Sequence, residues 1–66
     1  MIKEVLVWIE GLVRITMVDE NEEYMIDEYF DLSDAYEYDR ALAMYGDREI
    51  DFMEATDDGM IRIEIL

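Results

Sequence analysis

Apolar residues cluster in two runs near the start of the chain, residues 2–10 and 12–18, and both runs are rich in β-branched side chains. Glycine between two such runs is typical of a tight hairpin, so Glu10-Gly11 is predicted to join two strands. One face of this hairpin would then carry Ile2, Leu6, Trp8, Val13, Ile15 and Met17, with Trp8 in the core. The other would carry Val5, Val7, Ile9 and Leu12 beside Arg14 and Thr16. An apolar second face needs a cover, which predicts a homodimer or a hetero-partner there.

The middle of the chain contains a third strand, predicted over residues 24–28, and one helix, predicted over residues 34–45. Ser33 or Asp31 can cap the start of this helix, and Gly46 suits the position after its end. Helical spacing places on its inner face Ala35, Tyr38, Ala41, Leu42 and Tyr45. By contrast, Tyr24, Tyr29 and Tyr36 are expected to be at least partly exposed.

The last third of the chain contains the best local hairpin signal, Asp58-Gly59, between two apolar runs. This turn would place Ile50, Phe52, Ile61, Ile63 and Ile65 on one face, and Arg62 and Glu64 on the other. The whole chain, residues 1–66, is therefore predicted to be a single α+β domain. Its elements follow the order β-β-β-α-β-β, with one helix packed on a mainly antiparallel sheet of about five short strands.

Composition argues against catalysis and against a dedicated metal site. The chain has neither histidine nor cysteine, which are the usual general base, nucleophile and zinc ligands. Residues 19–30 begin like a calcium loop, but Tyr24 and Phe30 occupy the positions that need glycine and a bidentate glutamate. The sequence predicts no enzyme, no cofactor and no metal.

Negative charge is concentrated between residues 19 and 39, where ten of 21 residues are Asp or Glu and none is basic. The whole chain has 19 acidic and five basic residues, giving a net charge of −14. Self-repulsion on this scale disfavours a compact chain by about 5 kcal/mol, against a total stability of about 3–10 kcal/mol at this length. Because 53% of the residues are hydrophobic, a folded domain is still expected. The acidic surface is either a solvated face or a functional one.

A carboxylate-covered surface complements the basic groove of a nucleic-acid-binding protein. Helical residues three apart, such as Asp31, Asp34 and Glu37, have a spacing similar to that of neighbouring phosphates. So do alternate strand residues, predicted here for Asp47, Glu49 and Asp51. The predicted partner-binding residues are Asp19, Glu20, Glu22, Glu23, Tyr24, Asp27, Glu28, Asp31, Asp34, Tyr36, Glu37, Asp39, Asp47, Glu49 and Asp51.

In size, acidity and lack of a catalytic motif, the chain resembles the small acidic DNA-mimic inhibitors of phages and mobile elements, the anti-CRISPR and anti-restriction proteins. The resemblance rests on residues 19–39 and 46–52. It implies a cytoplasmic inhibitor, in the host cell if phage-encoded, that blocks the target-DNA or PAM-reading surface of a CRISPR effector or similar defence nuclease. Nucleic acid and membranes are not expected as direct partners. The alternative is a protein-interaction module, such as an antitoxin or a small assembly subunit with a solvated acidic face.

Overall fold

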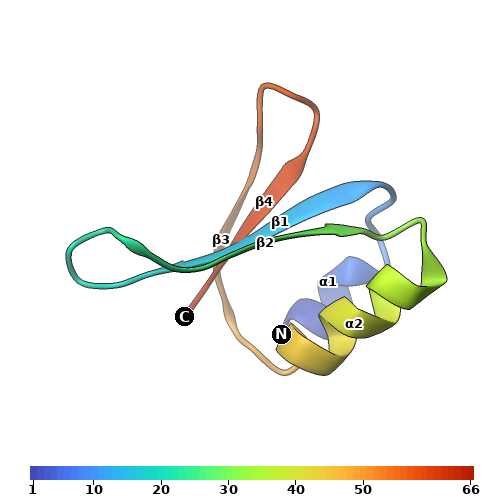
Figure 1. Ribbon diagram of the computed structural model, residues 1–66, viewed down its shortest axis with the longest axis horizontal. Helices are drawn as coiled ribbons and strands as arrows, with labels where there is room; N and C mark the ends of the chain where they lie inside the picture. Colours follow the sequence, from blue (N-terminus) through green and yellow to red (C-terminus); the bar gives the residue numbers. More distant parts are fainter.

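The computed structural model describes residues 1–66 as one open sheet of four strands with two helices on one side of it (Figure 1). The elements are α1 (Ile2–Leu6), β1 (Leu12–Val18), β2 (Tyr24–Asp31), α2 (Ala35–Tyr45), β3 (Ile50–Ala55) and β4 (Ile61–Ile65). The strand order is β2-β1-β4-β3. Both hairpins are antiparallel, while β1 and β4 are parallel, so the sheet is mixed. The predicted α+β class is confirmed, with four strands where about five were expected.

The first apolar run is a helix, so the predicted hairpin around Glu10-Gly11 is wrong. In α1, Ile2 and Leu6 are one helical turn apart and both are completely buried. The amide of Ile2 donates to the carbonyl oxygen of Arg48 at 2.9 Å, and that of Lys3 donates to Gly46 at 3.0 Å. Burial and these bonds to the segment that follows α2 outweigh the strand preference of the β-branched side chains.

This change of element also moves Trp8, which is 85% exposed and not in the core as predicted. The predicted second apolar face is not a strand face either, because Val5 and Ile9 are half-buried while Val7 and Leu12 are exposed.

The helix α2 begins and ends close to the prediction. Its N-cap is Asp34, and not Ser33 or Asp31 as predicted. The Asp34 carboxylate accepts hydrogen bonds from the amides of Tyr36 and Glu37 at 2.9 and 3.3 Å. Ala41 and Tyr45 on its inner face are buried against the sheet. The core lies between the helices and the sheet and consists of Ile2, Leu6, Val13, Ile15, Phe30, Leu32, Ala41, Tyr45, Ile63 and Ile65.

The hairpin β3–β4 forms around Asp58-Gly59 as predicted, and Gly59 supplies the positive φ of +82° that the turn needs. The predicted side-chain orientation in this hairpin is wrong at Phe52. The register shifts between Ile50 and Phe52, so Phe52 pairs with Glu64 instead of lying beside Ile63. One extra residue in an antiparallel pair reverses which way the following side chains point.

Neither helix is long and apolar enough to span a membrane.

Candidate partner-binding surface

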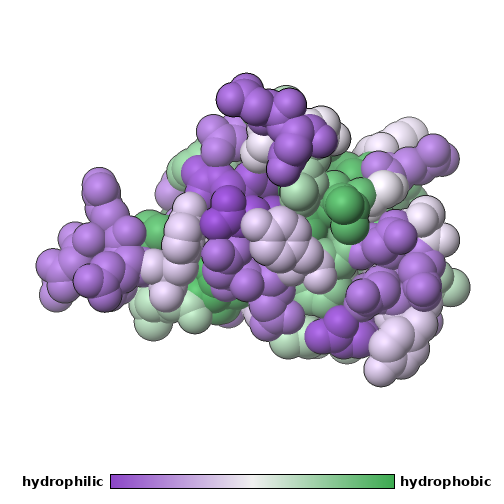
Figure 2. Space-filling view, turned by 45° about the horizontal axis from the view of Figure 1, so that its top comes forward, coloured by the Kyte–Doolittle hydropathy of each residue, from purple (hydrophilic) through white to green (hydrophobic).

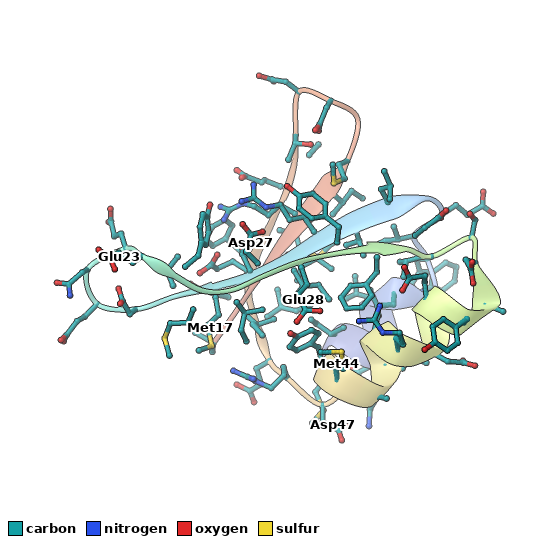
Figure 3. All side chains as sticks on the ribbon, viewed as in Figure 1. Met17, Glu23, Asp27, Glu28, Met44 and Asp47 are labelled. Atoms are coloured by element: carbon teal, nitrogen blue, oxygen red, sulfur yellow. The ribbon has the colours of Figure 1, made fainter.

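The predicted partner-binding residues surround the molecule and do not share a single face. Figure 3 shows Glu23 at the far end of the β1–β2 hairpin, and Asp27 and Glu28 on opposite sides of β2. Asp47 lies beyond α2, at the start of the loop to β3. In the space-filling view, hydrophilic side chains gather at the ends of both hairpins and on the side of α2 (Figure 2). The negative charge is therefore distributed over several projections of a thin molecule, 34 × 27 × 16 Å.

The basic residues are all engaged within the chain. Four of the five form ion pairs with carboxylates: Lys3 with Asp47, Arg14 with Asp27, Arg40 with Glu37 and Glu28, and Arg62 with Glu54 and Glu64. The fifth, Arg48, donates to the carbonyl oxygen of Leu66 at 2.6 Å. No basic side chain is thus left without a partner on the surface.

Most carboxylates, in contrast, have no cationic partner. Seven of the 19 lie in ion pairs, including Glu4 with the N-terminal ammonium. The other twelve are Glu10, Asp19, Glu20, Glu22, Glu23, Asp31, Asp34, Asp39, Glu49, Asp51, Asp57 and Asp58. The carboxylates without a cationic partner therefore outnumber the one basic side chain, Arg48, that lies outside an ion pair.

The two rows of evenly spaced acids that the sequence suggested are interrupted. Asp34 caps α2, Glu37 pairs with Arg40 at 2.6 Å, and Asp31 accepts from the hydroxyl and amide of Ser33. The Ser33 hydrogen bonds lower the pKa of Asp31. In the second row, only Asp51 lies in a strand, because β3 begins at Ile50. Several of these acids thus contribute to the fold as well as to the surface charge.

Glu28 has a structural position that the sequence did not indicate. It lies on the helix side of β2, where its carboxylate accepts a 2.7 Å hydrogen bond from the Tyr45 hydroxyl. The pKa of Tyr45 is raised to about 12, mainly by burial and to a lesser extent by this hydrogen bond to a carboxylate. Glu28 therefore ties β2 to α2 and is half-buried, unlike its neighbours Asp27 and Tyr29.

The face of the sheet away from the helices, hereafter the open face, carries Leu12, Arg14, Thr16, Val18, Tyr24, Asp27, Tyr29, Asp31, Phe52, Glu54, Arg62 and Glu64. On it, Arg14 donates two hydrogen bonds to Asp27, at 2.7 and 2.9 Å, and lowers the pKa of that carboxyl. The Arg14 guanidinium carbon also lies 5.0 Å from the ring centre of Tyr24 and 5.6 Å from that of Tyr29. This part of the face is an ordered cluster of one cation, one anion and two aromatic rings.

A second cluster is centred on Glu64, which is only 3% exposed although no helix covers it. Its Oε1 accepts from the Thr16 hydroxyl at 2.6 Å and from Arg62 at 3.1 Å, and its Oε2 accepts from the Val18 amide at 3.1 Å. Arg62 in turn binds Glu54 at 2.7 Å and stacks 5.0 Å from the Phe52 ring centre. The alternation of Arg62 and Glu64 in β4 was the signal in the sequence for this cluster, but it did not identify the carboxylate as buried.

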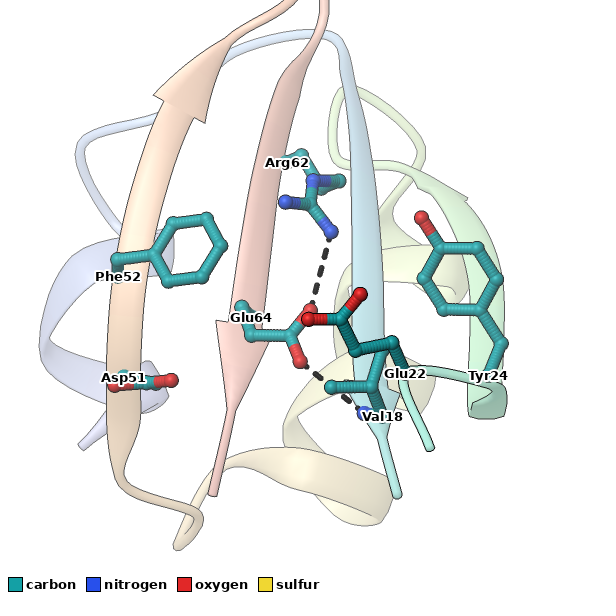
Figure 4. Close-up of a pocket in the computed structure, with 7 residues that line it drawn as sticks. All are labelled: Val18, Glu22, Tyr24, Asp51, Phe52, Arg62 and Glu64. Atoms are coloured by element: carbon teal, nitrogen blue, oxygen red, sulfur yellow. Dashed lines mark hydrogen bonds and ion pairs between the residues drawn. The ribbon is translucent and has the colours of Figure 1, made fainter. Parts of the chain in front are cut away.

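A pocket of about 370 Å³ lies over this second cluster (Figure 4). Arg62 and Glu64 form its floor, and Phe52 and Tyr24 stand on opposite sides. Glu22 lies in front of Glu64, and Asp51 lies beside Phe52 on β3. Val18 completes the lining. Of these seven residues, the sequence had indicated Glu22, Tyr24 and Asp51 as binding residues and had missed the other four.

Both outer strands bulge beside this pocket. The β1–β2 register shifts between Met17 and Val18, and the β3–β4 register shifts between Ile50 and Phe52. Bulges increase local twist and re-aim side chains. Here they turn Tyr24 and Phe52, from the two edge strands, toward the same end of the open face.

Comparisons with known proteins identify no relative of this chain. No protein-family model matches the chain, and no curated protein or solved structure shows significant similarity to it. No group of three or more acidic side chains is positioned to hold a metal ion.

Proposed function

We propose that this protein is a nucleic-acid-mimic inhibitor, which uses its carboxylate-rich surface to block the DNA-binding surface of a basic host protein. The target class is a CRISPR effector or a similar defence nuclease complex, at its target-DNA or PAM-reading surface, in the host cytoplasm. One observation carries the proposal: twelve carboxylates have no cationic partner, while all five basic side chains are bonded internally.

This distribution has two electrostatic consequences. A surface with such an excess of unpaired carboxylates repels nucleic acid, and it attracts the Lys- and Arg-lined groove that normally holds phosphates. Complementary charge of this kind accelerates association and orients the partner. A net charge of −14 therefore supports competition with DNA for a protein, and not binding to DNA itself.

The end of the β1–β2 hairpin is the best candidate for first contact. Residues 19–23 form a turn that projects from the body of the molecule, at the left of Figure 1. Asp19 fixes the turn by accepting from the amides of Asn21 and Glu23 at 2.8 and 3.0 Å. Glu20, Glu22 and Glu23 then project from a turn whose backbone is already ordered.

A second candidate function, a protein-interaction module such as an antitoxin or assembly subunit, is favoured by one other observation. Trp8 is 85% exposed, and Val7 and Leu12 nearby in the sequence are also exposed. Exposed Trp is a frequent anchor of protein interfaces. Binding through this site would depend little on salt, whereas binding through the carboxylates would weaken as salt rises.

The test is a competition experiment on the partner recovered from a host lysate with the immobilised protein. Fluorescent duplex DNA bound to that partner should be displaced by the parent protein. The double variant Glu20→Lys/Glu23→Lys should displace it at least about tenfold less well, since two attractive contacts become repulsive. The matched control is Glu10→Lys/Asp57→Lys, which changes the net charge equally at two other unpaired carboxylates and should retain most of the activity.

Two results would contradict the proposal. One is a parent protein that displaces nucleic acid from none of the basic partners recovered. The other is binding that Trp8→Ala abolishes and that high salt leaves unchanged, which would identify the interaction module instead.

A further inference from the structure

We infer that the pocket on the open face is a receptor for one arginine side chain of the partner protein. This rests on the proposed function, because it assigns the chemistry of a single contact within the basic surface that the inhibitor covers. The pocket lies between the two outer strands, with Glu22, Asp51 and Glu64 as its carboxylates and Tyr24 and Phe52 as its aromatic residues (Figure 4).

The charge of the pocket calls for a cation. The Arg62 guanidinium on its floor is already bonded to Glu54 and Glu64, and so its charge is compensated. Glu22 and Asp51 in the lining have no hydrogen-bond or ion-pair partner for their side chains and are exposed. The uncompensated charge of the pocket is therefore negative and lies on two exposed carboxylates that an incoming side chain can reach.

The aromatic residues favour a guanidinium over an ammonium group. Tyr24 and Phe52 are 50% and 43% exposed, so part of each ring is free to contact a guest. Each ring already lies 5.0 Å from a guanidinium carbon of this chain, that of Arg14 or Arg62. A planar guanidinium can stack on an aromatic ring and bond a carboxylate at the same time, which a lysine ammonium does less well.

Three features hold the site in place before a partner arrives. Three hydrogen bonds fix Glu64 on the floor. The bulge in β3 places Asp51 and Phe52 on adjacent positions of the pocket wall. Glu22 adopts a left-handed φ of +62°, which is unfavourable for a residue with a side chain and is imposed here by the turn that Asp19 closes.

The size of the pocket fits a single side chain. Its volume of about 370 Å³ is near the lower end of the roughly 300–1,000 Å³ typical of small-molecule sites. A segment of peptide backbone would have to lie across the mouth, with one residue inserted. The open face therefore provides one anchor, and the hairpin end provides the surrounding charge.

The experiment measures binding of N-acetyl-arginine amide to the isotopically labelled protein by NMR titration. The amides of Val18, Tyr24 and Phe52 should shift and saturate at millimolar concentration. N-acetyl-citrulline amide, which has the same shape and no charge, should cause no saturable shift. N-acetyl-lysine amide should bind several-fold more weakly than the arginine probe.

Two variant pairs locate the site. Glu22→Gln/Asp51→Asn should weaken arginine binding about tenfold or more, through loss of two charge-assisted contacts. Glu10→Gln/Asp57→Asn neutralises the same number of carboxylates away from the pocket and should leave binding within about twofold. Glu22→Gly is a second variant, and it should melt at or above the parent temperature because glycine accepts the left-handed φ. It should nevertheless bind the arginine probe more weakly.

The outcomes separate this inference from the proposed function. Equal binding of the arginine, lysine and citrulline probes, or arginine binding that survives Glu22→Gln/Asp51→Asn, overturns the arginine pocket even if the protein displaces DNA. Saturable arginine binding at the named amides supports the pocket even if no DNA is displaced, and then only the mimic function is wrong.

Discussion

The two faces of the sheet are made by alternate residues of the same strands, but different interactions order them. Toward the helices, Ile15 and Ile63 pair across β1 and β4 and are completely buried in the apolar core. One residue further along, Thr16 and Glu64 pair on the open face and are almost as buried, yet they are polar. The first face is stabilised by removal of apolar surface from water, the second by hydrogen bonds in which every buried polar atom has a partner.

This difference indicates how so small a chain can leave one face of its sheet uncovered. The Arg62 side chain, only 14% exposed, bonds Thr16 and Glu64. It covers these polar side chains on the open face, as the helices cover the apolar side chains on the other face. The open face is therefore ordered without being apolar. It can present aromatic rings and carboxylates to a partner while the helix side provides most of the stability.

The largest expected effect distinguishes the two phenylalanines, one on each face. Phe30 is completely buried and packs edge-to-face on Tyr45, with ring centres 6.1 Å apart. Phe30→Ala should reduce the free energy of unfolding by about 3–5 kcal/mol, which approaches the total stability of a chain this short. Circular dichroism should show a largely unfolded variant at 25 °C.

Phe52→Ala is the matched control for this prediction, because Phe52 lies on the open face and is 43% exposed. Its truncation should cost about 1 kcal/mol. If the two variants lose equal stability, the open face is part of the core, and the contrast between the faces is wrong.

The next effect concerns the polar network itself. Glu64→Ala removes the acceptor for Thr16, Arg62 and the Val18 amide, and should cost about 2–3 kcal/mol. Glu64→Gln keeps the shape and one acceptor oxygen, and should cost about half as much. Both variants relieve self-repulsion equally, so the difference between them in urea unfolding isolates the hydrogen bonds. Losses under 0.5 kcal/mol for both would show that the network adds little to stability.

The sequence was sufficient for the elements with strong local signals. Asp58-Gly59 predicted the β3–β4 hairpin, and helical spacing predicted α2, although its N-cap is Asp34 and not Ser33 or Asp31. It was misleading for residues 2–6, because β-branched apolar side chains favour a strand while burial of Ile2 and Leu6 against α2 decides for a helix. The helix or strand preference of a short segment carries no information about its contact with a segment forty residues away.

The candidate site was predictable only in part, for a related reason. The acidic block indicated Glu22 and Tyr24, and the row of alternate acids indicated Asp51, but no residue type marks the bulges that bring them together. A shift of one residue moves Phe52 from the core face to the open face, and with it one wall of the pocket. Nor could composition distinguish Asp27 and Glu64, which are paired internally, from carboxylates such as Glu20 that are free.

The smallest expected effect tests whether an exposed ion pair on the open face stabilises the fold at all. Asp27 and Arg14 are joined by two hydrogen bonds, but their side chains are 34% and 23% exposed. Asp27→Asn should therefore cost no more than about 1 kcal/mol at pH 7. Asp39→Asn, at a carboxylate of α2 without a partner, is the control and should cost nothing.

The pH dependence of this effect has a definite sign. Arg14 lowers the pKa of Asp27 in the folded protein, so the stabilisation is complete above the ordinary carboxyl pKa of about 3.9 and is lost as the pH falls through the lower folded value. The stability difference between the parent and Asp27→Asn should be constant from pH 7 to 5 and shrink below pH 4. Because protonation of free carboxylates relieves repulsion in both proteins, it cancels from this difference. A difference that instead grows in acid would mean that Asp27 is destabilised by its neighbours, and that charge repulsion extends even to the paired carboxylates of the open face.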